Sequence, residues 1–222
     1  MKSNLKQDKF LSTVIDNLKV PTIAQIKALE LFLSSSSDKI NSEEKDLIEL
    51  TLNSCNNMQK MIDNFSFITK LNSEKMNLSY KYFKFNELLD GIIKEADIFL
   101  KYSNINIDIN LSSEVEIYAD IFKIKKAVEN ILSFVINSCV KNSTINIFIN
   151  TDTTHLKFEI ISKGCIENGF DFIEILNQNK DCSSKYMELF IAKEIIKAHF
   201  GKIIIKNSEN NLNTIGFTLP IK

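Results

Sequence analysis

The stretch Phe10-Leu11-Ser12-Thr13-Val14-Ile15-Asp16-Asn17-Leu18-Lys19-Val20-Pro21 opens the first regular pattern of this 222-residue chain. Across residues 8–33, apolar side chains recur at steps of three, four or multiples of seven, a spacing typical of a helix that offers one stripe to a bundle. The stripe consists of Leu11, Ile15, Leu18, Leu29 and Phe32. Thr22 and Gln25 interrupt it. The pattern predicts a long helix that carries the quoted stretch on its first turns.

A second helix is predicted over residues 42–71. Small polar residues separate it from the first, and Asn41 or Ser42 followed by Glu43 and Glu44 is typical of a helix start, with acids near its positive end. Its apolar stripe consists of Ile48, Cys55, Met58, Ile62 and Phe65. Two helices alone cannot cover both stripes, so we expect two hairpins to pair as a four-helix dimer. The alternative is that the hairpin packs on the domain that follows it.

Composition narrows the class of protein. A chain that is 44% hydrophobic and 25% charged is ordinary for a globular protein, and a formal net charge of -1 argues against nucleic acid as a partner. No window approaches the roughly 20 apolar residues of a membrane span, and the first residues lack the apolar core of a signal peptide. We therefore expect a cytoplasmic protein. The four cysteines form no C-x-x-C pair, so we expect no metal site.

A second domain, residues 76–222, is predicted after the polar connector at residues 72–75, because the periodicity then changes repeatedly. Helices are expected at residues 86–100, 120–139 and 187–199, the last stopped by Gly201. Strands are expected at residues 105–109, 145–149, 156–160, 202–206 and 214–220. The predicted fold class is α+β, in which the hairpin of residues 1–75 precedes an α/β sandwich with one mixed sheet covered by helices on one face.

Three motifs in this chain resemble those of one protein family. The quoted stretch resembles F-x-S-x-x-S-H-E-L-R-T-P, residues 120–132 (D-I-F-K-I-K-K-A-V-E-N-I-L) resemble D-x-x-R-L-x-Q-V-L-x-N-L-L, and residues 191–201 resemble I-A-K-x-I-V-E-A-H-G-G. These are motifs of sensor histidine kinases. The resemblance implies a dimerisation and phosphoacceptor hairpin followed by an ATP-binding domain of the Bergerat or GHKL type. Asp16 takes the position of the phosphoacceptor histidine.

The resemblance also implies a magnesium site on the helix of residues 120–139, where the family has N-x-x-x-N-A-x-K. This chain keeps Asn130, but Phe134 replaces the magnesium ligand and Asn137 replaces the phosphate-binding lysine. A phenyl ring has no lone pair for Mg²⁺, so Phe134 is interpreted as a plug. A slip of one helical turn would restore an asparagine ligand but would spoil the match of Leu132 and Thr144.

Two further nucleotide motifs are altered. In the adenine motif D-x-G-x-G, Ser162 replaces the acid, Gly164 keeps the first glycine and Ile166 replaces the second. A serine hydroxyl accepts a weaker hydrogen bond than a carboxylate does. The phosphate-binding glycines are replaced by Ser184, Tyr186 and Glu188. Bulky or acidic side chains at these positions would obstruct or repel phosphate.

The leading hypothesis is a catalytically inactive histidine-kinase-like protein of two-component signalling, with no cofactor. It would dimerise with itself or with a histidine kinase, and it would dock a response regulator receiver beside Asp16, Asn17, Lys19 and Pro21. The alternatives are a divergent kinase or ATPase acting on another target, which needs a degenerate site that still binds ATP and magnesium, and a phosphotransferase-like relay protein. Asp16 either imitates a phosphohistidine crudely or is an ordinary solvated residue. His155 and His199 are expected to serve packing or capping.

Overall fold

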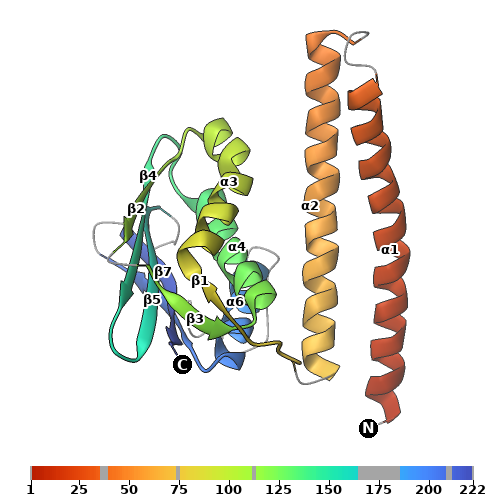
Figure 1. The fold of residues 1–222 in the computed structure, drawn as a ribbon. Coiled ribbons are helices and arrows are strands. Elements are labelled where there is room, and N and C mark those ends of the chain that lie inside the picture. Colours follow the sequence, from red (N-terminus) through yellow and green to blue (C-terminus); the bar gives the residue numbers. More distant parts are fainter. Residues whose placement is uncertain are drawn as a thin grey trace. The chain divides into compact units, whose positions relative to one another are not determined.

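The computed structural model describes residues 2–35, 40–73, 76–111, 114–164, 186–208 and 212–221. The chain divides into two compact units, Met1–Lys75 and Met76–Lys222 (Figure 1). The first is a pair of long helices and the second is a sheet with helices. In the described residues, no helix is both long enough and apolar enough to cross a membrane.

The first unit is a helical hairpin of α1 (Lys2–Ser35) and α2 (Ser42–Ser73), which lie side by side. A reciprocal capping box starts α2. The backbone N–H of Glu44 donates to Asn41 Oδ1 over 2.9 Å, and the backbone N–H of Asn41 donates to Glu44 Oε2 over 3.0 Å. Asn41 is therefore the residue that caps this helix. The apolar seam between the helices buries Ile15, Ile26, Cys55 and Ile62.

The predicted stripe on the first helix is wrong in part, because Leu18 is 52% exposed and Phe32 is 45% exposed. The residue that continues the seam from Ile15 is Thr22, which is only 3% exposed, followed by Ile26. At about 100° per residue, Thr22 and Ile26 lie within roughly 20° of Ile15 around the helix, whereas Leu18 lies about 60° away and Phe32 about 100° away. Spacing in steps of three drifts off the seam, and steps of seven and eleven stay on it.

The second unit contains, among its described residues, a five-stranded mixed sheet in the order β2-β4-β5-β7-β6. The strands are β2 (Asn106–Leu111), β4 (Thr144–Thr151), β5 (His155–Lys163), β6 (Lys202–Asn207) and β7 (Leu212–Pro220). Only the β2–β4 pair is parallel. Helices α3 (Phe85–Ser103), α4 (Ile121–Ser138) and α6 (Met187–Ala198) lie on one face of the sheet (Figure 1). The predicted α/β sandwich is confirmed.

The core of this unit lies between the sheet and the helices. The rings of Phe85 on α3 and Phe217 on β7 pack on Phe158 of β5, with centroid distances of 5.6 and 5.1 Å. All three side chains are buried. Of the cysteines, Cys55 is buried in the hairpin and Cys139 is half-buried at the end of α4, while Cys165 and Cys182 lie outside the described residues.

A second, two-stranded sheet was not predicted. It pairs β1 (Lys81–Lys84) with β3 (Glu116–Ala119) in antiparallel fashion, with Tyr82 opposite Tyr118. Its four-residue strands are too short for an alternating pattern to be recognised, and the two partners lie far apart in the sequence. Asp120, the residue that follows β3, then caps α4 by accepting hydrogen bonds at Oδ1 from the N–H groups of Phe122 and Lys123, each 3.1 Å long.

The end of α6 differs from the prediction. The left-handed residue after the helix is Phe200, with φ of 60°, rather than Gly201. Gly201 is needed for a different reason, because a Cβ there would lie 2.2 Å from the carbonyl oxygen of Thr218. The backbone of β7 thus approaches too closely for any side chain at position 201.

Candidate functional site

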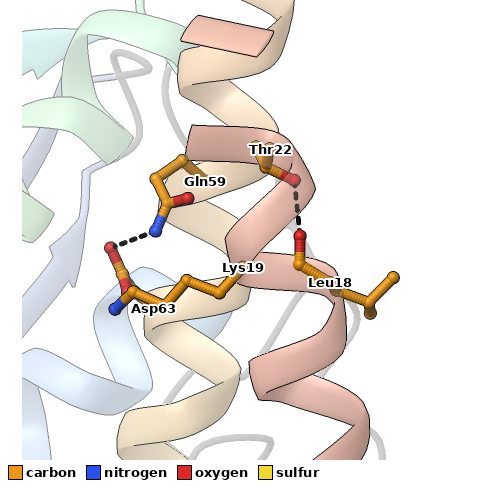
Figure 2. Close-up of polar contacts among 5 residues, drawn as sticks. All are labelled: Leu18, Lys19, Thr22, Gln59 and Asp63. Atoms are coloured by element: carbon orange, nitrogen blue, oxygen red, sulfur yellow. Dashed lines mark hydrogen bonds and ion pairs between the residues drawn. The ribbon is translucent and has the colours of Figure 1, made fainter. Parts of the chain in front are cut away.

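The phosphoacceptor position lies on the outer surface of α1. Asp16, Asn17 and Pro21 are exposed there, and Lys19 is partly buried. The Lys19 ammonium donates to Asp63 Oδ1 of α2 over 2.7 Å, and Gln59 Nε2 donates to Asp63 Oδ2 over 3.1 Å (Figure 2). Of the four residues predicted to dock a receiver, three are therefore available on the surface, and the fourth is held by the neighbouring helix.

Pro21 lies inside α1, where its ring removes one backbone donor from the helix. The hydroxyl of the next residue, Thr22, donates to the carbonyl oxygen of Leu18 over 2.7 Å (Figure 2). This bond satisfies the buried hydroxyl without a partner from α2. The helix therefore continues through the proline, and the surface beside Asp16 stays helical.

On α4 the three positions of the magnesium motif point in different directions. Asn130 is 1% exposed and Phe134 is 2% exposed, so both face the core, whereas Asn137 is exposed. Within the described part of the chain, Asn130 Nδ2 is buried and has no hydrogen-bond partner. A buried donor without a partner costs about 1–3 kcal/mol. Asn130 is thus an uncompensated polar group beside the position that Phe134 occupies.

Two contacts join this face of α4 to the start of α6. The ring centroids of Phe134 and Tyr186 lie 6.2 Å apart, within the range of aromatic packing. Next to them, the Ser133 hydroxyl donates to Glu188 Oε1 over 3.1 Å, and Asn137 Nδ2 lies 3.5 Å from Ser133 Oγ. The structure therefore brings together Phe134, Tyr186, Glu188 and Asn137.

Ser133 was missed by the sequence reasoning, although it contacts both Glu188 and Asn137. Its position four residues before Asn137 places the two on one helix face, which is the signal that could have indicated that contact. The contact with Glu188 joins residues 55 positions apart, and no local pattern indicates it.

The adenine-motif residues lie at the end of β5. Ser162 is buried, at 2% exposed, and stands opposite the buried Asn213 of β7. Gly164 has φ of 87°, and a Cβ there would lie 2.7 Å from Cγ2 of Val140. This close approach explains Gly164 without a ligand. Ser184 lies outside the described residues.

The described side chains do not fit magnesium and a nucleotide triphosphate as the resemblance would require. Phe134 supplies no oxygen ligand, and the described residues contain no group of three or more acidic, histidine or cysteine side chains suited to a metal ion. The positive N-terminal turn of α6 already holds the Glu188 carboxylate, where an anionic phosphate would otherwise be favoured. A second negative group there would be repelled.

The two histidines have separate structural roles. His199 Nε2 accepts a hydrogen bond from the backbone N–H of Asp120 over 3.1 Å, and Nδ1 lies 2.8 Å from the Ile195 carbonyl oxygen. Burial lowers the pKa of His199, which agrees with a neutral ring that accepts at Nε2. His155 is exposed at the start of β5, with Nδ1 2.8 Å from Thr154 Oγ1. His199 therefore connects the end of α6 to the start of α4.

Comparisons with known proteins place this architecture. No family model matches the chain. The phosphate regulon sensor protein PhoR of Haemophilus influenzae is 22% identical over 158 residues, which are 71% of this chain and 36% of that protein. The chain spans about a third of the length of the curated relatives it matches.

Solved structures of histidine kinases share the fold. The Acinetobacter baumannii histidine kinase AdeS superposes with a TM-score of 0.65 at 13% identity, covering 90% of this chain and 95% of that one. Histidine kinase ThkA, in its complex with the response regulator protein TrrA, superposes with a TM-score of 0.63 at 18% identity, covering all of this chain and 65% of that one. This chain therefore has the fold of a sensor histidine kinase core, a helical hairpin followed by an α/β sandwich of the ATP-binding type.

Proposed function

We propose that this chain is a cytoplasmic, histidine-kinase-like protein of two-component signalling that lacks kinase activity and acts by dimerising and by docking a response regulator or a partner kinase. The observation that carries the proposal is the junction of α4 with α6. Phe134 packs on Tyr186 and Ser133 bonds to Glu188, where the resemblance expects magnesium and phosphate.

Opening that junction for a nucleotide would be costly. Phe134 is 2% exposed, and withdrawing a buried phenyl ring costs about 3 kcal/mol of transfer free energy. The Glu188 carboxylate would also have to leave its hydroxyl donor and then face the phosphate charge. Since position 16 carries aspartate in place of histidine, the hairpin also lacks the family's phosphate acceptor.

Dimerisation is supported by the apolar side chains that the hairpin leaves exposed. Leu31, Leu47, Leu50 and Met61 are 68%, 64%, 66% and 59% exposed. Together with Leu18, Val20 and Phe32 they make a large apolar surface for two helices, and such surfaces mark interaction sites. Pairing with a second hairpin, from this chain or from a kinase, would cover them in a four-helix bundle.

Receiver docking is supported by the surface beside position 16. Asp16, Asn17 and Pro21 are exposed on a continuous helix, and the Lys19–Asp63 ion pair ties that surface to α2. The similar ThkA structure is a complex with a response regulator. We propose that a receiver lies against this part of α1, without transfer of a phosphoryl group.

The test measures nucleotide binding and receiver binding on the same preparation. ATP titrated with and without Mg²⁺ should leave the melting temperature unchanged, since only a ligand that binds the native state raises it. Receiver domains from the same organism, titrated by calorimetry, should include one that binds, and Asp16→Lys should weaken that binding while Asp108→Lys on the second unit leaves it unchanged. Magnesium-dependent stabilisation by ATP would refute the inactive kinase, and failure of all receivers and kinases to bind would refute docking.

One observation favours the alternative of residual nucleotide binding. Asn130 is the retained asparagine of the motif, and its buried Nδ2 has no partner in the described part of the chain. A bound adenosine nucleotide without a metal ion could supply an acceptor. The ATP titration without Mg²⁺ tests this alternative directly, and Asn130→Ala should abolish any stabilisation that it reveals.

A further inference from the structure

Phe200 combines two unfavourable features in one residue. Its φ of 60° is left-handed, a conformation that bulky residues rarely adopt and that glycine usually supplies after a helix. Its side chain is also 81% exposed. A glycine at this position would relieve the backbone strain and remove apolar surface from water. The fold itself therefore gains nothing from the phenyl ring.

The ring of Phe200 forms part of the wall of a cavity of about 220 Å³ in the second unit. The other lining residues are Tyr80, Tyr118, Ala119, His199, Leu219 and Pro220. Pockets for whole small molecules usually measure about 300–1,000 Å³, so this cavity has room for one large side chain or ring. Its lining is mainly apolar and aromatic, as in pockets that receive a protein anchor residue.

Aromatic packing holds the shape of this pocket. The ring of Tyr80 lies 5.3 Å from that of Tyr118 and 5.4 Å from that of His199, measured between centroids. Tyr82 continues the row at 4.8 Å from Tyr118. His199 is fixed in turn by its bonds to the backbone of Asp120 and Ile195. The pocket is therefore preorganised, which lowers the entropy lost when a partner binds.

The charges beside the pocket indicate the chemistry of the partner. Lys81, Lys197 and Lys202 are exposed, and each lies within three positions of a lining residue. The nearest acid, Asp120, is 5% exposed and uses its carboxylate to accept from the backbone of Ser79, Phe122 and Lys123. The exposed Glu116 stands opposite Lys84 in the strand register. The rim is therefore cationic and complements an anionic partner.

We propose that this aromatic pocket is a docking site for a protein segment that inserts one aromatic or large aliphatic side chain and carries acidic residues beside it. Phe200 and Tyr118 grip the inserted side chain, and the lysines of the rim attract the flanking carboxylates. Burial raises the pKa of Tyr80, so its phenol stays protonated and can donate a hydrogen bond to such a segment. This site is independent of the α4–α6 junction and of the hairpin surface.

The test selects peptides on the full chain. A random dodecapeptide display library should yield sequences that carry an aromatic or large aliphatic residue flanked by Asp or Glu. A synthesised winner should bind Phe200→Gly and Tyr118→Ala about tenfold more weakly than the parent chain. Phe122→Ala is the matched control, since Phe122 is 79% exposed but does not line the pocket, and it should bind as the parent chain does.

Two further measurements separate docking from folding and charge from shape. Phe200→Gly should raise the melting temperature, so that its loss of binding cannot come from unfolding. The double variant Lys197→Glu, Lys202→Glu should weaken binding about tenfold and reduce its salt dependence. The proposal is overturned if no peptide is selected, if the selected peptides are basic, or if their binding survives Phe200→Gly. A change of oligomeric state in Phe200→Gly without peptide binding would assign the pocket to a second copy of the chain.

Discussion

The hydroxyl of Ser133 on α4 donates a hydrogen bond of 3.1 Å to the carboxylate of Glu188 in the first turn of α6. This contact joins two helices beside the packed rings of Phe134 and Tyr186. A serine at position 133 thus gives a partner to the acid that stands where the resemblance expects a phosphate-binding glycine. The altered residues support one another, because each fills or satisfies what the other leaves open.

A double-mutant cycle should detect this support. We expect Ser133→Ala and Glu188→Ala to be coupled by about 1 kcal/mol in the free energy of unfolding, because each removes the other's partner. Urea denaturation of the two single variants and the double variant measures the coupling. Ser133→Ala with Glu194→Ala, a later acid of the same helix, should give additive effects. Additivity in both cycles would show that the Ser133–Glu188 bond contributes nothing.

Truncation of Phe134 should destabilise the second unit strongly. Its ring is 2% exposed, so Phe134→Ala leaves a cavity and should lower the free energy of unfolding by about 3–5 kcal/mol. The exposed Phe122 on the same helix is the matched control, and Phe122→Ala should change stability by less than about 0.5 kcal/mol. Denaturant midpoints measured at equal slopes compare the two. Similar small effects would mean that Phe134 does not fill the core.

Stability should fall as the pH drops below the ordinary histidine pKa. Burial is the main cause that lowers the pKa of His199 from 6.5, so between its folded pKa and 6.5 the unfolded chain binds more protons than the native one. The free energy of unfolding therefore rises with pH through this window and is fully regained above it. The backbone N–H of Asp120 loses its acceptor when His199 is protonated.

Thermal unfolding of the parent chain and of His199→Gln at pH 5.5 and 7.5 would measure this dependence. The variant should lose most of the difference between the two pH values. Asp152, whose pKa is lowered from 3.8 by hydrogen bonds from the backbone of Thr154, acts only below this window. An equal pH dependence in both proteins would exclude His199 as its source.

Restoring the acceptor should not restore the kinase. Asp16→His recreates the histidine of the family motif on an exposed helical surface, but Phe134 and Glu188 still occupy the expected magnesium and phosphate positions. Incubation with labelled ATP and Mg²⁺ should therefore leave the variant without acid-labile phosphate, as it should Asp16→Asn. Labelling of Asp16→His alone would reveal an active nucleotide site and contradict the proposed function.

Local patterns predicted much of the fold because helices and long strands are specified by neighbouring residues. The start of α2 at Asn41 and Glu44 could be recognised from capping chemistry, and the strands of the five-stranded sheet from alternation. The exposed Leu18 was misplaced because its spacing fits a helix face without deciding which face meets α2. The pair β1–β3 was missed because neither strand is long enough to show a period.

For the candidate site, the sequence by itself determined which chemical groups are missing. A phenyl ring cannot ligate magnesium and an aspartate is not a histidine, whatever surrounds them. Only the tertiary structure decided what the replacements do instead. Phe134 meets Tyr186, Ser133 meets Glu188 and Phe200 forms one wall of a pocket, because residues distant in sequence are brought together by packing rather than by any local period.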